Sequence, residues 1–223
     1  MYNKHLNWLL FILISSIFLG CNKKMDGYKK QFQYGVASGE PESSSIIIWT
    51  KVDVAFLDKK VMWEISKDSL FSSIIDEGVF VVNLDSDGTI KLKVDNLEPS
   101  TTYYYRFNNQ GVSSMIGRSK TLPSELDMPK EFKIAFVDCN NYQDGYFNAF
   151  EALSNMDDID LVVHLGDYIY EYEAGRYADT LLADRSHLPP NETITLEDYR
   201  IRYAQYRSDP SLQKVHAKFP FLF

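Results

Sequence analysis

The sequence predicts a mixed fold, in which an all-β sandwich at residues 32–125 is followed by an incomplete α/β domain at residues 131–223. In the first region, short segments rich in β-forming residues recur at regular spacing with turn residues between them, which is typical of a β-sandwich. In the second region, two apolar runs flank an amphipathic stretch, as in a βαβ unit. Residues 123–130 are polar, contain two prolines and predict a linker between the two regions.

The β prediction rests on segments dominated by β-branched, aromatic and other apolar residues. We predict strands at Ser44–Val52, Lys60–Ser66, Glu77–Asn83, Thr89–Val94 and Gly117–Leu122. The stretch from Leu97 to Arg106 combines a proline turn, a threonine and a run of tyrosines, and it resembles a turn and strand of fibronectin type III domains. This resemblance implies a sandwich of the fibronectin or immunoglobulin type.

The N-terminus has the pattern of an export signal. A short basic segment precedes an apolar run from Leu9 to Leu19, which is shorter than the about 20 apolar residues of a membrane-spanning helix. The segment Ile17–Cys21 resembles a bacterial lipoprotein box, in which cleavage before the cysteine is coupled to its lipidation. We therefore predict a lipoprotein signal peptide at residues 1–20, lipidation of Cys21 and a tether at residues 21–31. The mature protein would be exported and held at a membrane of the bacterial cell envelope by its acyl chains.

The charge balance excludes one class of partner. A formal net charge of −8 and a pI near 5.0 argue against nucleic acid, because binding to the phosphate backbone depends on lysines and arginines. An anionic substrate would need local positive charge, which bound metal ions supply. With 45% hydrophobic residues, the composition is that of a folded protein.

The βαβ unit places two polar side chains at one edge of a sheet. One apolar run, Lys133–Asp138, leads into Cys139, and a second, Asp160–His164, leads through a glycine into Asp167. Parallel strands joined by such a crossover end at the same edge, and adjacent strands lie about 4.8 Å apart. We therefore expect Cys139 and Asp167 to reach a common ion. The helix between the strands is predicted from apolar residues at helical spacing, namely Phe147, Phe150, Leu153 and Met156.

Cys139 and Asp167 are the first candidates for chemistry. The only cysteines are Cys21 and Cys139, so a lipidated Cys21 leaves Cys139 without a disulfide partner in the chain. Cys139 is then either a small buried apolar residue or a metal-binding thiolate. Asp167 is a carboxylate at the carboxyl end of a buried strand, where open α/β sheets bind ligands. Tyr170 follows it by three positions.

A further helix is predicted to begin at Leu196, with Thr195 as its N-cap and Asp198 near its positive end. Leu196, Tyr199, Tyr203 and Tyr206 share one face of this helix, and we expect that face to pack in the core.

Four groups of residues match a known pattern when they are taken together. They are Gly35–Pro41 with Ile48–Thr50, Asp138–Asn140 with Gly145–Ala149, His164–Tyr172, and Leu196–Arg200 through Tyr206–Pro210 with His216. In combination they resemble the PhoD-like alkaline phosphatases. The resemblance implies a fibronectin-like domain followed by a calcineurin-like metallophosphatase domain that holds iron and calcium. It implies that Asp167 bridges the metals and that Cys139 and Tyr170 ligate ferric iron.

The implied activity is metal-dependent hydrolysis of a phosphate ester, either a monoester or a diester. A thiolate, a carboxylate and a phenolate suit a highly charged cation, which can deprotonate the thiol and the phenol. Paired metals about 3.5–4 Å apart polarise phosphoryl oxygens and lower the pKa of a bound water. A metal-bound hydroxide would attack phosphorus, so we predict no side chain as the nucleophile.

Two neighbours of the predicted ligands have open roles. Asp138 stands where the family usually has a small residue, and it is either an extra ligand or a structural acid, of which we prefer the second. We expect His164 to be packed or to support a ligand rather than to bind metal itself.

The length of the chain leads to one further expectation. In the family, the segment that matches Lys218–Phe223 leads into another strand and an Asp-Asp-His-Glu cluster. A βαβ unit with one more helix would also leave sheet edges and apolar faces uncovered. We therefore expect a truncated chain that is inactive alone. The alternatives are a surface lipoprotein whose sandwich is a binding module beside a relic phosphatase domain, and a different binuclear hydrolase such as a nucleotidase or phosphodiesterase.

Overall fold

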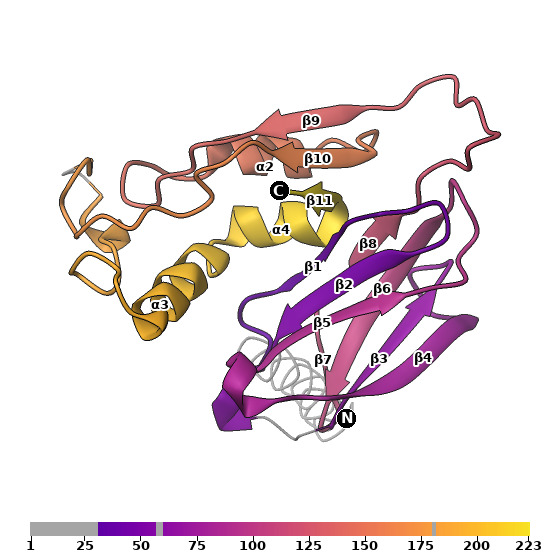
Figure 1. The fold of residues 1–223 in the computed structure, drawn as a ribbon, viewed down its shortest axis with the longest axis horizontal. Helices are drawn as coiled ribbons and strands as arrows, with labels where there is room; N and C mark the ends of the chain where they lie inside the picture. Colours follow the sequence, from indigo (N-terminus) through magenta and orange to yellow (C-terminus); the bar gives the residue numbers. More distant parts are fainter. Residues whose placement is uncertain (1–30, 57–59, 180–181) are drawn as a thin grey trace, which may run out of the picture.

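The computed structural model describes residues 31–56, 60–179 and 182–223, and within these ranges the strands form two sheets (Figure 1). The larger sheet runs in the order β5 (Thr89–Val94), β2 (Ile46–Lys51), β1 (Val36–Gly39), β11 (Pro220–Leu222), β10 (Leu161–His164) and β9 (Ile134–Val137). The smaller sheet runs in the order β4 (Ile74–Val81), β3 (Lys60–Ser66), β6 (Thr102–Asn109) and β7 (Val112–Ser113), and β8 (Gly117–Lys120) also pairs with β6. The helices are α2 (Asn148–Ser154), α3 (Leu196–Arg207) and α4 (Pro210–Lys218), with short 3-10 turns η1 (Val54–Phe56), η2 (Leu84–Ser86) and η3 (Ala183–Arg185).

Strands β5, β2 and β1 pack against the smaller sheet and form a β-sandwich. Side chains alternate along β2 and β6, because successive residues of a strand point to opposite faces. The inward side chains Ile48, Tyr105 and Phe107 are fully buried in one shared core. Complete burial of one such side chain contributes about 1.5–3 kcal/mol. The β-rich first region is therefore confirmed.

The start of β6 is fixed by a tyrosine. The hydroxyl of Tyr103, whose ring is buried, accepts a hydrogen bond of 2.9 Å from the backbone N–H of Glu98. This contact ties the strand back to the proline turn that precedes it in the sequence. It is the arrangement called a tyrosine corner in immunoglobulin-like sandwiches.

The βαβ unit is present where the sequence predicts it. Strands β9 and β10 are parallel neighbours, and α2 lies between them in the chain. Phe150 and Leu153 of α2 are buried against this sheet, whereas Met156 lies beyond the end of the helix and is half exposed. The α/β character of the second region is confirmed.

The larger sheet continues from the sandwich into the α/β region (Figure 1). Strand β11 pairs in parallel with β10 on one side and with β1 on the other. A β-carbon at Gly39 would lie 2.8 Å from the carbonyl oxygen of Phe221, closer than side-chain carbons approach backbone. Glycine at position 39 therefore allows the two strands to meet.

Helix α3 begins as predicted but buries a different face. Thr195 and Asp198 form a capping box at its N-terminus. Tyr206 is fully buried, yet Leu196, Tyr199 and Tyr203 are 67%, 39% and 41% exposed, so the expectation of a core-facing tyrosine stripe is wrong for these three. The buried face instead carries arginines, whose hydrogen bonds to backbone carbonyls permit their burial.

Helix α4 was not predicted. Its N-cap, Asp209, accepts hydrogen bonds from the N–H groups of Ser211 and Leu212, and Pro210 occupies the first helical turn. Aspartate followed by proline is a recognised helix start, so the signal was in the sequence.

In the ranges that the structure describes, no helix has the length and apolar character to cross a bilayer. Among the described residues, strand β9 lies at the edge of its sheet, and Ile134 and Phe136 on it are exposed. The predicted signal peptide and Cys21 lie outside the described residues.

Candidate metal centre

The candidate site lies at the carboxyl ends of β9 and β10. The segments that follow these strands are joined by backbone hydrogen bonds, from the N–H of Cys139 to the carbonyl of Gly166 and from the N–H of Asn140 to the carbonyl of Asp167, each 3.3 Å. The predicted meeting of the two strand ends at one edge of the sheet is therefore confirmed.

Cys139 and Asp167 both have left-handed backbone conformations. Their φ angles are 53° and 51°, and Gly166 between the strand and Asp167 has φ 137°. Residues other than glycine rarely adopt such angles, at a cost of about 1–3 kcal/mol each, and they cluster at functional sites. Both side chains are thereby turned toward one another at the sheet edge.

Three side chains meet at this edge. The thiol of Cys139 donates to the carboxylate Oδ2 of Asp167 at 3.6 Å, and the phenol of Tyr170 donates to the same oxygen at 3.1 Å. Cys139 is exposed, which overturns the interpretation of it as a buried apolar residue. The structure thus brings together all three residues that the sequence singled out.

The electrostatics of the group hold the phenol protonated. Partial burial raises the pKa of Tyr170, and its hydrogen bonds with Cys139 and Asp167, together with the negative charge of Asp167, raise it further. A cation placed among the three donors would reverse this effect, because it stabilises the phenolate.

The donor chemistry fits a highly charged metal ion. A thiol, a carboxylate and a phenol offer sulfur and oxygen donors on the segments that follow the two strands. Among the described residues, no cluster of three or more His, Cys, Asp or Glu side chains is suited to a metal, so Tyr170 is needed to complete a three-donor group. A hollow of about 380 Å³ adjoins Cys139 and is lined by Asp138, Asn141 and Tyr146 among others.

Behind the donors, His164 is packed as predicted. Its Nδ1 accepts from the N–H of Gly166 at 3.3 Å, so Nε2 carries the proton and donates to Oδ1 of Asn140 at 2.6 Å. Burial lowers the pKa of His164, partly offset by Asp138 and Asp167. The Asn140 amide in turn donates to the carbonyl of Tyr168 at 2.9 Å. This neutral histidine fixes the backbone behind both donor segments. Asp138 is exposed.

Comparison with known proteins identifies the family. The family model described as PhoD-like phosphatase matches residues 134–223, and that of the PhoD-like phosphatase N-terminal domain matches residues 20–123. The chain belongs to the PhoD-like phosphatase family.

Individual relatives agree with this assignment. Alkaline phosphatase D of Bacillus subtilis (strain 168) is 38% identical over 199 residues, which is 86% of this chain and 34% of that protein. A solved structure of PhoD has a TM-score of 0.80 at 38% identity, covering 86% of this chain and 38% of that one. The chain therefore spans about a third of the length of these PhoD relatives. A sensor domain of the anti-sigma factor RsgI4 from Pseudobacteroides cellulosolvens matches 40% of this chain and 94% of its own length at 20% identity. Its TM-score of 0.32 is too low to support a conclusion about this chain.

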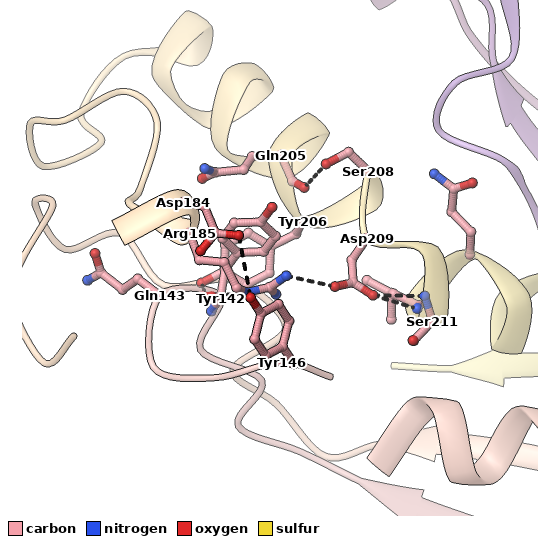
Figure 2. Close-up of polar contacts among 12 residues, drawn as sticks. Tyr142, Gln143, Tyr146, Asp184, Arg185, Gln205, Tyr206, Ser208, Asp209 and Ser211 are labelled. Atoms are coloured by element: carbon pink, nitrogen blue, oxygen red, sulfur yellow. Dashed lines mark hydrogen bonds and ion pairs between the residues drawn. The ribbon is translucent and has the colours of Figure 1, made fainter. Parts of the chain in front are cut away.

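In this PhoD-like chain the loop after Cys139 is anchored by Arg185, a residue that sequence reasoning missed (Figure 2). The Arg185 guanidinium donates from Nε to the carbonyl of Tyr142 at 2.8 Å and from Nη1 to Asp209 Oδ2 at 3.0 Å. It also stacks on the Tyr142 ring, 3.8 Å from the ring centre. Arg185 and Asp209 are 6% and 5% exposed as side chains. No local pattern marks Arg185, because its partners are distant in the sequence.

Proposed function

We propose that this chain forms part of a metal-dependent phosphoester hydrolase, as its family and its relative named alkaline phosphatase D suggest. The observation that carries the proposal is the meeting of Cys139, Asp167 and Tyr170 within 3.1–3.6 Å at the carboxyl ends of two parallel strands. Open α/β sheets place ligands at this edge.

In this proposal Cys139, Asp167 and Tyr170 hold ferric iron, and Asp167 also contacts a calcium ion, as the family resemblance implies. Bound metals would polarise the phosphoryl group of a phosphate ester and lower the pKa of water. Asp167 already accepts hydrogen bonds from both other donors, so it lies at the centre of the group. Cys139 and Tyr170 would each release a proton on binding metal, which makes binding stronger as pH rises.

We further infer a fibronectin-like sandwich and attachment to a membrane. The tyrosine corner of Tyr103 and the division of the sandwich into β5-β2-β1 and a second sheet of β4-β3-β6 flanked by β7 and β8 support the first. The lipoprotein-box resemblance of Ile17–Cys21 supports an exported protein anchored through Cys21. Radiolabelled palmitate retained by the wild type and lost in Cys21→Ser would support the anchor, whereas equal labelling of both would contradict it.

The experiment on function uses the chain purified without chelators. Iron and calcium are measured by elemental analysis, and hydrolysis of a phosphomonoester and a phosphodiester is followed at alkaline pH. We expect Cys139→Ser and Asp167→Asn to lose iron, while Asp138→Asn, the exposed neighbour, retains it. Absence of bound iron in the wild type would overturn the proposed metal site, whereas hydrolysis would show in addition that the chain is active on its own. Metal loss in Asp138→Asn would make that residue a ligand.

A further inference from the structure

Arg202 is a fully buried arginine in α3, and in the part of the chain that the structure describes its hydrogen-bond acceptors are backbone carbonyls. Its Nε donates to the carbonyl of Leu188 at 2.9 Å and its Nη2 to the carbonyl of Pro189 at 2.9 Å. Its Nη1 donates to the carbonyls of Tyr170 and, at 3.1 Å, Tyr172. A buried charge is tolerated when its hydrogen-bonding groups are satisfied in this way.

The carbonyls of Tyr170 and Tyr172 that Arg202 holds lie outside helices and strands, and the carbonyl of Tyr172 also accepts from His187 Nδ1 at 3.1 Å. Residues 170–173 belong to no helix or strand, so no ladder of backbone hydrogen bonds fixes them. Buried carbonyl groups nevertheless require donors. The planar guanidinium supplies them in a fixed fork, which a lysine ammonium cannot reproduce.

The same segment carries a donor of the candidate metal centre. The backbone of Tyr170 is held by Arg202, and its phenol reaches in the other direction to Oδ2 of Asp167 at 3.1 Å. A shift of the backbone would therefore move the phenol relative to Asp167 and Cys139. Side chains that orient ligands in this way tune a metal site without touching the metal.

We propose that Arg202 is a positioning residue that holds Tyr170 in place for metal binding. The metal part of this inference rests on the proposed function, whereas the placement of the phenol does not need a metal. Both can therefore be tested separately.

Arg207 provides a matched control on the same helix. It is also almost completely buried and donates to the carbonyls of Tyr34 and Val36, at the start of the sandwich. Its positive charge also offsets part of the rise in the pKa of Tyr168 that burial causes. An Arg207→Lys variant therefore tests whether any loss of a buried guanidinium near this region would disturb Tyr170.

The experiment labels Tyr170 with fluorotyrosine and records ¹⁹F NMR spectra of the metal-free full chain. We expect one narrow resonance in the wild type and in Arg207→Lys, and a split or shifted resonance in Arg202→Lys. Circular dichroism verifies folding, and Arg202→Gln replaces the lysine variant if that one does not fold. An unchanged Tyr170 resonance in a folded Arg202 variant, or the same change in Arg207→Lys, would overturn the proposal.

A second arm adds ferric iron to unlabelled protein and follows the phenolate-to-iron charge-transfer absorption. We expect Arg202→Lys to bind iron about 10–100-fold more weakly, as is usual when a ligand's support is lost. If the wild type binds no iron, the proposed function fails, while the NMR spectra still decide whether Arg202 positions Tyr170. If Arg202→Lys, Arg207→Lys and the wild type bind iron with equal affinity, the positioning role is refuted.

Discussion

Breaking the buried ion pair between Arg185 and Asp209 should destabilise the protein strongly, and this effect can be separated from the loss of helix capping. Asp209 uses Oδ2 for Arg185 and Oδ1 for the N–H groups of Ser211 and Leu212 (Figure 2). Asparagine keeps an oxygen for the cap but loses the charge. We expect Asp209→Asn to lower the free energy of unfolding by about 3 kcal/mol, because a buried guanidinium loses its counterion. Asp209→Ala should lower the free energy of unfolding by about 1 kcal/mol more than Asp209→Asn, because it also removes the oxygen that caps α4.

Urea unfolding monitored by circular dichroism measures these changes. In a double-mutant cycle, Arg185→Met should lower the free energy of unfolding by about 2–3 kcal/mol less in the Asp209→Asn background than in the wild type. In that background, removing Arg185 leaves no unpaired carboxylate at position 209. The exposed pair of Lys67 and Glu98 is the control, and Lys67→Gln should leave stability unchanged. Additive costs in the cycle, or an Asp209→Asn variant as stable as the wild type, would refute the reasoning.

Acid should weaken the fold through His187, which is fully buried and accepts from Tyr206 at Nε2. Burial and the nearby Arg202 lower its pKa from 6.5 to about 4, so the unfolded chain binds a proton first as pH falls from 6.5 to 4. The free energy of unfolding should fall by about 3 kcal/mol over that window, at about 1.4 kcal/mol per pH unit. Chemical denaturation should show that the free energy of unfolding depends less on pH in His187→Gln than in the wild type. Gly39→Ala should destabilise the pairing of β1 with β11, seen as faster amide hydrogen exchange at those strands; unchanged exchange would contradict the steric argument. Tyr103→Phe should lower the free energy of unfolding by about 1 kcal/mol through the lost hydrogen bond to Glu98; a melting temperature equal to that of the wild type would show that the corner is dispensable.

The sequence predicted what depends on local pattern. Alternation and turn residues located most strands of the sandwich, and the apolar runs before Cys139 and Asp167 located the strand ends that meet. Thr195 and Asp198 predicted the start of α3 because a capping box is a local interaction. The convergence of Tyr170 on Asp167 followed from family resemblance, not from spacing.

What the sequence did not predict depends on partners far along the chain. The tyrosine stripe of α3 indicated a core face, but Tyr199 and Tyr203 remain partly exposed because Arg202 and Arg207 take the buried face. A buried arginine is recognisable only when its carbonyl acceptors are known, and those of Arg202 lie 13 to 32 positions away.

The pairing of β1 with β11 has consequences for the synthesis and expression of the protein. Strand β1 is synthesised early, yet one of its neighbours is completed only when Phe221 has left the ribosome. Until then β1 presents an open edge, which is a template for aggregation. Contacts between such distant residues also slow folding. A shortened protein limited to residues 32–125 would keep that edge open permanently, so the sandwich should express better when β11 accompanies it.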